Sequence, residues 1–266
     1  NAGVAFARIR STLEAAKPVQ IVLKKAGFTD VSPVEKQCVP DTEFSTLRLP
    51  NPEEVDALSM AIAQAEACGA DLVIATDPDA DRMGTAVRDA NGRYVPLTGN
   101  QIGCLLLYNR LRDLQAQNKL AANDFVVKSI VTTQLAKAIA DDFGVKLYNV
   151  LTGFKYIGEK IEQYDGKAGH FLFGFEESYG YLSGSYVRDK DAVDGAFLIC
   201  EMFAYYKSRG ISLTAKLKEL YGTYGYCLNT LHSYEFDGSA GFAKMQSIMA
   251  SFREKIPEFG GKRVKA

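Results

Sequence analysis

The chain has 266 residues, of which 47% are hydrophobic and 24% charged, and its formal net charge is −1 at pH 7. These values are ordinary for a globular protein. A near-neutral chain with dispersed basic residues offers no general surface for nucleic acid or for an anionic membrane. No apolar stretch is long enough to span a bilayer, and residues 1–10 lack the apolar core of a secretory signal, so we expect a cytoplasmic protein.

Cysteine and histidine usage narrows the possible chemistry. The 5 cysteines are widely spaced and include no Cys-x-x-Cys motif, which is typical of free thiols in a reducing compartment. The only histidines in the sequence are His170 and His232. They exclude a His-rich metal site and disfavour a Ser-His-Asp triad.

The first part of the chain predicts alternating helices and strands. In order, these are helix Val19–Ala26, strand Val31–Glu35, a helix beginning at Asn51–Glu54, strand Leu72–Ala75, and a hairpin of Met83–Val87 with Tyr94–Leu97. In the second helix we expect Val55, Leu58, Ile62 and Ala65 to form the buried stripe and Gly69 to end the helix.

The alternation continues after Thr98–Asn100, which we interpret as a hinge. The predicted elements are helix Gln101–Gln117, strand Phe125–Val131, helix Gln134–Phe143, strand Lys146–Val150, helix Tyr156–Gln163, strand His170–Phe175 and helix Asp191–Lys207. Tyr221–Gly225 is interpreted as another boundary, with a helix near Ala243–Phe252 beyond it. This order favours an α/β fold: two consecutive α/β domains with mixed sheets flanked by helices.

An acidic loop follows the predicted strand Leu72–Ala75. Asp77, Asp79 and Asp81 stand at alternate positions, and Arg82 comes directly after them. Three carboxylates so close together repel one another unless a cation lies among them, and a hard divalent ion held by carboxylate oxygens satisfies that need. The forked donors of Arg82 suit a phosphate group. The loop therefore predicts Mg²⁺ together with phosphate.

Other chemistries also fit an acidic loop, the simplest being a solvated turn. A calcium-binding EF-hand needs Gly at its sixth position and Glu at its twelfth, where this chain has Arg82 and Arg88. A phosphatase of the haloacid dehalogenase type would use Asp77 as nucleophile and Asp79 as acid/base. Such an enzyme has Thr or Val two residues after the second aspartate, where Asp81 stands here. The phosphatase stays open as an alternative.

Further loops with polar side chains follow the later predicted strands. Gly153 permits an unusual backbone and places Lys155 at a helix start, although Lys155 could equally be a solvated surface residue. Glu176 and Ser178 point the same way if the backbone is extended, and a carboxylate with a hydroxyl suits sugar hydroxyls; a charged turn is the alternative. Arg188–Asp191 places two cations at a helix start, where they bind phosphate or pair with neighbouring aspartates.

Taken together, these loops resemble those of the α-D-phosphohexomutases, the phosphoglucomutase and phosphomannomutase family. The matching stretches are Asp77–Arg82, Thr152–Lys155, Gly174–Ser178, Pro40–Phe44, Pro50–Glu53 and Arg188–Asp191, in the family's order and spacing. The Glu-Glu-Ser form of the loop at residues 176–178 is similar to phosphoglucomutases rather than to members with Glu-Met-Ser, which favours glucose phosphates over mannose phosphates.

The resemblance implies a Mg²⁺-dependent exchange between hexose 1-phosphate and hexose 6-phosphate. A phosphoserine donates the phosphoryl group, and glucose 1,6-bisphosphate is the intermediate and activator. The implied roles cover one Mg²⁺ site, charge stabilisation in phosphoryl transfer, acid/base work and substrate binding. Asp77, Asp79 and Asp81 would hold the Mg²⁺, Arg82 would stabilise charge, and Lys155 would do the acid/base work. The sugar hydroxyls would be bound by Glu176 and Ser178, and the substrate or its phosphate by Arg188 and Lys190.

Two family motifs are missing from the sequence: the Thr-Ala-Ser-His-Asn-Pro-like phosphoserine loop and the Arg-x-Ser-Gly-Thr-Glu-like phosphate loop. We therefore interpret the chain as the central part of a mutase. Residues 1–99 would be the second, metal-binding domain and residues 100–222 the third, sugar-binding domain. Residues 223–266 would be a linker and the start of a fourth, α+β domain.

Under this interpretation the partners are hexose phosphates and the missing first and fourth domains, with no nucleic acid and no membrane. We expect the isolated chain to bind Mg²⁺ weakly and to have no mutase activity. Two other hypotheses remain: the phosphatase that uses Asp77, and a non-catalytic sugar-phosphate binding protein.

Overall fold

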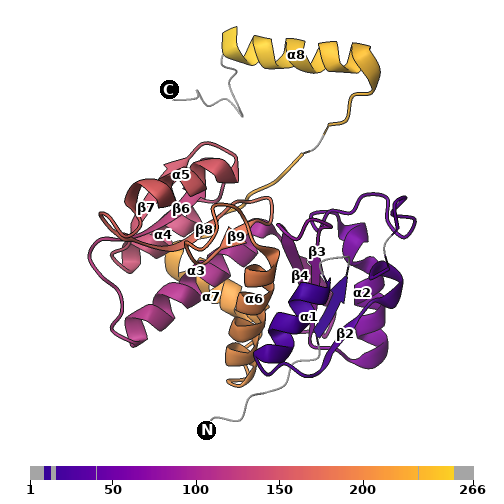
Figure 1. Ribbon diagram of the computed structural model, residues 1–266, viewed down its shortest axis with the longest axis horizontal. Helices are drawn as coiled ribbons and strands as arrows, with labels where there is room; N and C mark the ends of the chain where they lie inside the picture. The colour runs from indigo at the N-terminus through magenta and orange to yellow at the C-terminus, as the bar shows by residue number, and fades with distance from the viewer. Residues whose placement is uncertain (1–8, 13–15, 40, 233, 255–266) are drawn as a thin grey trace. The chain divides into compact units, whose positions relative to one another are not determined.

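The computed structural model describes residues 9–12, 16–39, 41–232 and 234–254 (Figure 1). They fall into two compact units that divide after Cys227. Residues 1–8 of the first predicted domain, Pro40 of one matching stretch, and residues 255–266 of the predicted fourth-domain start lie outside the described residues. The predicted boundaries after residues 99 and 222 remain predictions.

The first unit contains two sheets, and the first of them is mixed. Its strands are β1 (Ile9–Thr12), β2 (Val31–Pro33), β3 (Leu72–Thr76), β4 (Met83–Arg88) and β5 (Tyr94–Leu97), in the spatial order β2-β1-β3-β4-β5. Strand β1 runs parallel to β2 and β3, whereas β3, β4 and β5 are antiparallel. The predicted hairpin is therefore confirmed as β4 and β5.

Strand β3 has helices on both of its faces, which makes it the fully buried strand that its apolar run predicts. Leu72 and Ile74 belong to the same core cluster as residues of α1 (Ala16–Lys25) and α6 (Ala192–Lys207). Val73 and Ala75 point the other way and pack with α2 (Val55–Cys68). The period of two along a strand thus divides one short apolar run between two helical layers.

The second sheet is also mixed. Its strands are β6 (Asp124–Ser129), β7 (Lys146–Val150), β8 (His170–Phe175) and β9 (Tyr181–Leu182), in the order β7-β6-β8-β9, and only β9 is antiparallel to its neighbour. Phe125 and Val127 pack against α5 (Phe154–Tyr164) on one face. Val126 faces α3 (Gly99–Ala116) and α4 (Leu135–Asp142) on the other. The predicted α/β fold with mixed sheets flanked by helices is confirmed.

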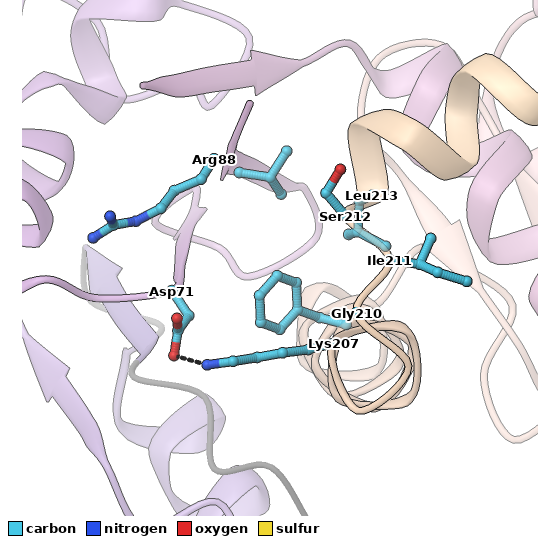
Figure 2. A pocket seen from close by; sticks show the side chains of 9 residues that line it. Asp71, Arg88, Lys207, Gly210, Ile211, Ser212 and Leu213 are labelled. Carbon is cyan, nitrogen blue, oxygen red and sulfur yellow. Dashed lines mark hydrogen bonds and ion pairs between the residues drawn. The ribbon is translucent and has the colours of Figure 1, made fainter. Parts of the chain in front are cut away.

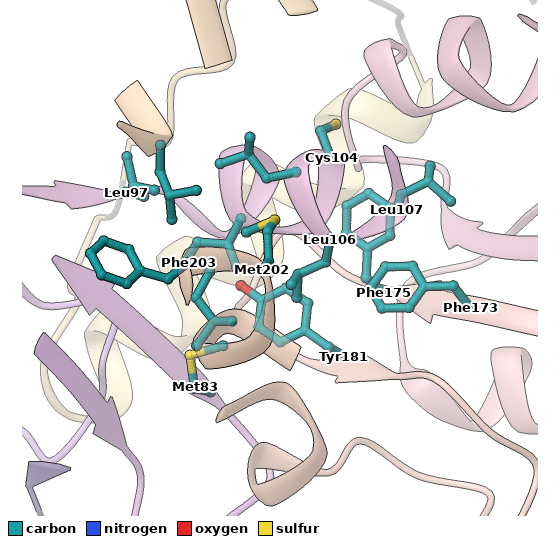
Figure 3. Packing of buried hydrophobic residues seen from close by; sticks show 14 of the residues in the cluster. Met83, Leu97, Cys104, Leu106, Leu107, Phe173, Phe175, Tyr181, Met202 and Phe203 are labelled. Carbon is teal, nitrogen blue, oxygen red and sulfur yellow. The ribbon is translucent and has the colours of Figure 1, made fainter. Parts of the chain in front are cut away.

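One hydrophobic core joins the two sheets. Figure 3 shows Met83 of β4 beside Tyr181 of β9, with Leu106 of α3 and Met202 of α6 in the same cluster. Helix α6 packs against α1, β3 and β4 although it follows the second sheet in the sequence. Burying a large apolar side chain contributes about 1.5–3 kcal/mol, so the shared core fixes the loops of one sheet relative to those of the other.

Several predicted elements differ from the structure at their ends. The helix predicted to begin at Asn51–Glu54 begins at Val55, because Asn51 closes a turn: its Oδ1 accepts the amide of Glu53 at 3.0 Å and its carbonyl accepts the amide of Glu54 at 3.0 Å. The buried face is accordingly shifted, with Val55 66% exposed. That face consists of Ala57, Leu58, Ala61 and Ala65.

The predicted hinge at Thr98–Asn100 is the start of helix α3. Thr98 is its N-cap, forming a capping box with Gln101. Gly99 lies so close to the backbone of the loop after β8 (residues 176–180) that an added Cβ would be 2.0 Å from the Glu177 carbonyl oxygen. Glycine is needed here for a close approach of two segments rather than for flexibility.

Some elements of the structure have no counterpart in the sequence prediction. They are β1, β9, the short 3₁₀ helix η1 (Glu35–Gln37) and α7 (Leu213–Tyr224). Helix α7 carries a readable signal, since Ser212 caps its first turn and Leu213, Leu217 and Leu220 form its buried stripe. The two-residue strand β9 is too short to show any periodicity.

The second unit contains helix α8 (Gly238–Glu254), which includes the predicted helix near Ala243–Phe252. Within residues 228–232 and 234–254 the structure shows no strand, so the predicted start of an α+β domain remains a prediction. Among the described helices of the chain, none has the length and apolar character needed to cross a bilayer.

Candidate functional site

The acidic loop begins where β3 ends and is held by its own backbone. Asp77 is buried, and its Oδ1 accepts the amides of Asp81 at 3.1 Å and Arg82 at 2.9 Å. Ala80 takes a left-handed conformation with φ of 60° at the turn, and its carbonyl accepts the amide of Ala192 of α6 at 2.9 Å. As a result, Asp77, Asp79 and Asp81 each offer an oxygen within 4.8 Å of the others.

The charges of this loop are not fully compensated by the protein. Burial, together with the nearby carboxylates of Asp81 and Asp79, raises the pKa of Asp77 to about 7 despite the opposing hydrogen bond from the Arg82 amide. Among the described residues, Asp81 Oδ1 is buried without a hydrogen-bond partner. An acidic cluster with a buried oxygen that accepts no hydrogen bond fits a hard divalent cation.

Two cationic side chains flank the carboxylates. Arg82 places Nε 3.7 Å from Asp77 Oδ2 and 3.8 Å from Asp81 Oδ1, while its Nη1 lies 3.0 Å from Glu53 Oε1. Lys190 Nζ lies 2.5 Å from Asp81 Oδ2. Burial alone would lower the pKa of Lys190, but its contacts with Asp81 and Asp189 outweigh burial and raise it.

Glu176 connects the loops that follow β8 and β7, the two strands on either side of β6 in the sheet. It comes directly after β8 and is buried, and its Oε1 accepts the Gly153 amide at 2.8 Å in the loop after β7. Gly153 has φ of 120°, which other residues rarely adopt. Burial raises the pKa of Glu176. Ser178 is half-buried two residues further on.

The loops of the two sheets meet at the same place. The amide of Met83 donates to the Tyr179 carbonyl at 2.9 Å, and the backbones of Arg82 and Gly180 form an antiparallel β-bridge. An added Cβ at Gly180 would lie 2.3 Å from Lys190 Cδ. The structure therefore brings together six of the predicted site residues, and Ser178 lies in the same loop as Glu176. They are Asp77, Asp79, Asp81, Arg82, Glu176 and Lys190.

Two predicted residues lie apart from this group. Lys155 is exposed in the first turn of α5, with Nζ 5.0 Å from the centre of the Tyr156 ring. Arg188 pairs with Glu162 of α5 at 3.2 Å and donates to the Ser185 carbonyl. In the part of the chain that the structure describes, no hydrogen bond or ion pair joins either side chain to the acidic loop.

Comparison with known proteins agrees with this architecture. Residues 14–92 match the model for "Phosphoglucomutase/phosphomannomutase, alpha/beta/alpha domain II", and residues 98–224 match the model for domain III of the same family. The chain belongs to the phosphoglucomutase/phosphomannomutase family. The resemblance read from the loops is confirmed. Members of this family generally use a metal ion.

Curated relatives in the family include phosphoglucomutases of Staphylococcus aureus. That of strain N315 is 42% identical over 246 residues, which cover 92% of this chain and 44% of the relative. The chain thus spans less than half the length of this relative. Its identity to the USA300 protein is 41%.

Solved structures of the family share the fold. A putative phosphomannomutase from Thermus thermophilus superposes with a TM-score of 0.67 and 22% identity, covering 84% of this chain and 47% of that one. The parafusin phosphoglucomutase of Paramecium, in its open form, gives 0.62 and 20%, covering 94% and 42%.

One site residue of this family member escaped the sequence prediction. Glu53 is expected from the sequence in a helix start and in a matching stretch, with no role of its own, but it forms the ion pair with Arg82 described above. Its loop lies tightly on β4, since an added Cβ at Gly84 would be 2.9 Å from Pro52 Cβ. Burial raises the pKa of Glu53 despite the nearby Arg82. The match of Pro50–Glu53 to the family was the available signal.

A cavity of about 210 Å³ lies away from the family loops (Figure 2). It is lined by residues of β4, α6, the connection between α6 and α7, the first residue of α7 and the residue before β3, and it includes the ion pair between Lys207 and Asp71. None of the predicted site residues lines it. Because Asp71 precedes β3 whereas Asp77 follows it, this cavity and the acidic loop lie at opposite ends of the strand.

Proposed function

We propose that the protein to which this chain belongs interconverts hexose 1-phosphate and hexose 6-phosphate by Mg²⁺-dependent phosphoryl transfer, with glucose favoured over mannose. One observation supports this most: the acidic loop, two cationic side chains and Glu176 lie together where the loops of the two sheets meet. A shared core fixes the two sheets relative to each other. The curated relatives named above are phosphoglucomutases. The phosphoserine that the reaction requires is absent from this sequence, so the activity belongs to the longer protein.

In this proposal Asp77, Asp79 and Asp81 hold one Mg²⁺. The fit rests on the three converging oxygens and on the buried Asp81 Oδ1 that has no hydrogen-bond partner in the described structure. When bound, the ion supplies positive charge that offsets the negative charge of the transferring phosphoryl group. The amides of Asp81 and Arg82 hold Asp77 in place, so the protein orders that ligand in advance.

Arg82 stabilises charge during phosphoryl transfer. Glu53 holds one arm of its guanidinium group, which limits the directions in which the remaining donors point. Fixed donors of this kind lower a barrier because they need little reorganisation in the transition state. Lys190 contacts the substrate or its phosphate, and Arg188 is a further substrate contact.

Glu176 and Ser178 bind the sugar hydroxyls. Glu176 has one oxygen committed to the Gly153 amide, which leaves the other oxygen of a buried carboxylate for a hydroxyl donor. Lys155 serves as acid/base or as a transition-state cation from the first turn of α5, with glucose 1,6-bisphosphate as intermediate and activator. The remaining partners are the first and fourth domains of the same protein, which we place in the cytoplasm.

The test uses the full-length protein beside this chain. Both receive glucose 1-phosphate, Mg²⁺ and a trace of glucose 1,6-bisphosphate, and glucose 6-phosphate is measured. We expect turnover only in the full-length protein. Release of inorganic phosphate by the chain alone, with a trapped aspartyl phosphate at Asp77, would make the protein a hydrolase. Binding without turnover in the full-length protein would make it a sugar-phosphate binding protein.

A further inference from the structure

A lysine lies completely buried behind the loop after β8 (residues 176–180), called the sugar loop below because of its proposed role. Lys128, near the end of the central strand β6, has no exposed surface. Its Nζ donates to the carbonyl oxygens of Ser129 at 3.1 Å and Thr132 at 2.9 Å, in the loop between β6 and α4. A buried ammonium group is costly unless it is hydrogen-bonded and near a negative charge.

The negative charge near Lys128 comes from Glu177. The hydroxyls of Ser129 and Thr132 lie 2.7 Å apart, and each is placed to donate to Glu177 Oε2, at 2.9 and 3.0 Å. Lys128 therefore holds the carbonyls of the same two residues whose hydroxyls hold Glu177. The ammonium and the carboxylate are joined through one short loop.

Adjacent glutamates of the sugar loop thus bind two different neighbouring loops. Glu177 is tied to the loop after β6, whereas Glu176 is tied to Gly153 in the loop after β7. On its other side the Glu177 carbonyl lies against Gly99, where an added Cβ would come within 2.0 Å. The backbone that carries Glu176 and Ser178 is consequently held between helix α3 and the loop after β6.

We propose that Glu177 is a positioning residue, tied through Ser129 and Thr132 to the buried Lys128, and that this network sets the backbone that presents Glu176 and Ser178 to the sugar. The inference rests on the proposed function, because it assigns the network a task in hexose phosphate binding. Glu177 itself does not touch the substrate, since its carboxylate is turned toward the loop after β6.

The first experiment compares Glu177→Met with Lys137→Met in the full-length protein. Lys137→Met is the control for replacing a charged side chain by methionine outside the network, because Lys137 is an exposed lysine of α4 whose ion pair with Asp141 lies on the surface. Isothermal titration measures the affinity for glucose 1-phosphate and, separately, for Mg²⁺. We expect Glu177→Met to weaken glucose 1-phosphate binding about tenfold and to leave Mg²⁺ binding within about twofold. Lys137→Met should change neither.

The second experiment tests whether the parts act together. Lys128→Met, Glu177→Met and the double variant form a cycle, and the double variant should bind glucose 1-phosphate about as weakly as Glu177→Met alone. Should Lys128→Met fail to fold, the Ser129→Ala/Thr132→Val variant breaks the same connection while keeping the ammonium group. Independent effects that multiply in the double variant would contradict a single network.

A readout without sugar separates this inference from the proposed function. Hydrogen exchange of the amides of residues 176–180 should become about tenfold faster in Glu177→Met, with or without ligand. If the wild-type protein binds no hexose phosphate, the proposed function fails and the inference about sugar binding fails with it, while the exchange rates still report the loop's restraint. A Glu177→Met protein that unfolds at a lower temperature but binds glucose 1-phosphate normally has lost only stability, and the positioning role is wrong.

Discussion

The acidic loop after β3 and the sugar loop after β8 are neighbours, but they differ in how far the protein itself satisfies their carboxylates. In the acidic loop, Asp81 keeps a buried oxygen without a hydrogen-bond partner in the described structure, and burial raises the pKa of Asp77 to about 7. In the sugar loop, Glu176 and Glu177 both accept hydrogen bonds from neighbouring loops. The first loop concentrates charge that an external cation can compensate, whereas the second has its shape set by the protein itself.

The largest expected effect comes from the acidic loop. Asp79 is exposed and supplies one of the three clustered carboxylates. Asp79→Ala should therefore lower the mutase rate of the full-length protein about 10²–10³-fold while leaving the fold intact. Asp141→Ala, at an exposed aspartate of α4, is the control. Mutase rate and thermal unfolding are measured for both variants. An unchanged rate would remove Asp79 from the metal site.

A smaller effect of opposite sign is expected at Lys190. Its ammonium group lies 2.5 Å from Asp81 Oδ2 and so competes with any metal ion for that carboxylate. Lys190→Met should therefore strengthen Mg²⁺ binding by this chain about three- to tenfold, measured by isothermal titration, and should weaken glucose 1-phosphate binding in the full-length protein. Weaker Mg²⁺ binding in the variant would show that Lys190 supports the metal site rather than competing with it.

The smallest expected effect concerns the stability of the sugar loop. Burial raises the pKa of Glu176 above its ordinary value of 4.5. The folded protein therefore holds this proton more tightly than the unfolded chain does, and stability falls as the pH rises from 4.5 through the raised pKa. Glu176→Gln keeps an acceptor for the Gly153 amide without the buried charge. We expect it to raise Tm by about 2 °C at pH 7.

The pH dependence supplies the check on that prediction. The difference in Tm between Glu176→Gln and the wild type should vanish below pH 4.5, where the wild-type carboxyl is protonated in both states. The same variant should bind glucose 1-phosphate less tightly at neutral pH. A variant that is less stable than the wild type at pH 7 would show that the ionised carboxylate stabilises the loop.

The sequence predicted the architecture well where a local signal was strong. Strands Lys146–Val150 and His170–Phe175 are confirmed at both ends, because turn residues bound their apolar runs. The helix predicted from Asn51 was wrong in its start, since the Asn51 side chain forms a turn with the backbone in place of a cap. Local hydrogen bonds of this kind compete with helix initiation and cannot be told from capping by residue type.

The candidate site was predictable in composition but not in its connections. Alternate spacing placed Asp77, Asp79 and Asp81 together, and the structure agrees. The ion pairs of Arg82 with Glu53 and of Lys190 with Asp81 join residues far apart in the chain, so no local pattern reveals them. In the sequence Lys128 looks like any other residue of a predicted strand, and only the tertiary structure shows that it is buried.

Helix α6 has a consequence for how this family should be divided into pieces. It lies in the stretch that matches domain III, yet its apolar residues cover Leu72 and Ile74 of β3 in the stretch that matches domain II. Residues 1–99 produced alone would keep α1 on that face of β3 but would expose the apolar surface that α6 covers, and would tend to aggregate. In this chain the border between the two family-domain matches therefore does not divide the hydrophobic core. A recombined mutase that exchanges domain II would have to bring a compatible α6 with it.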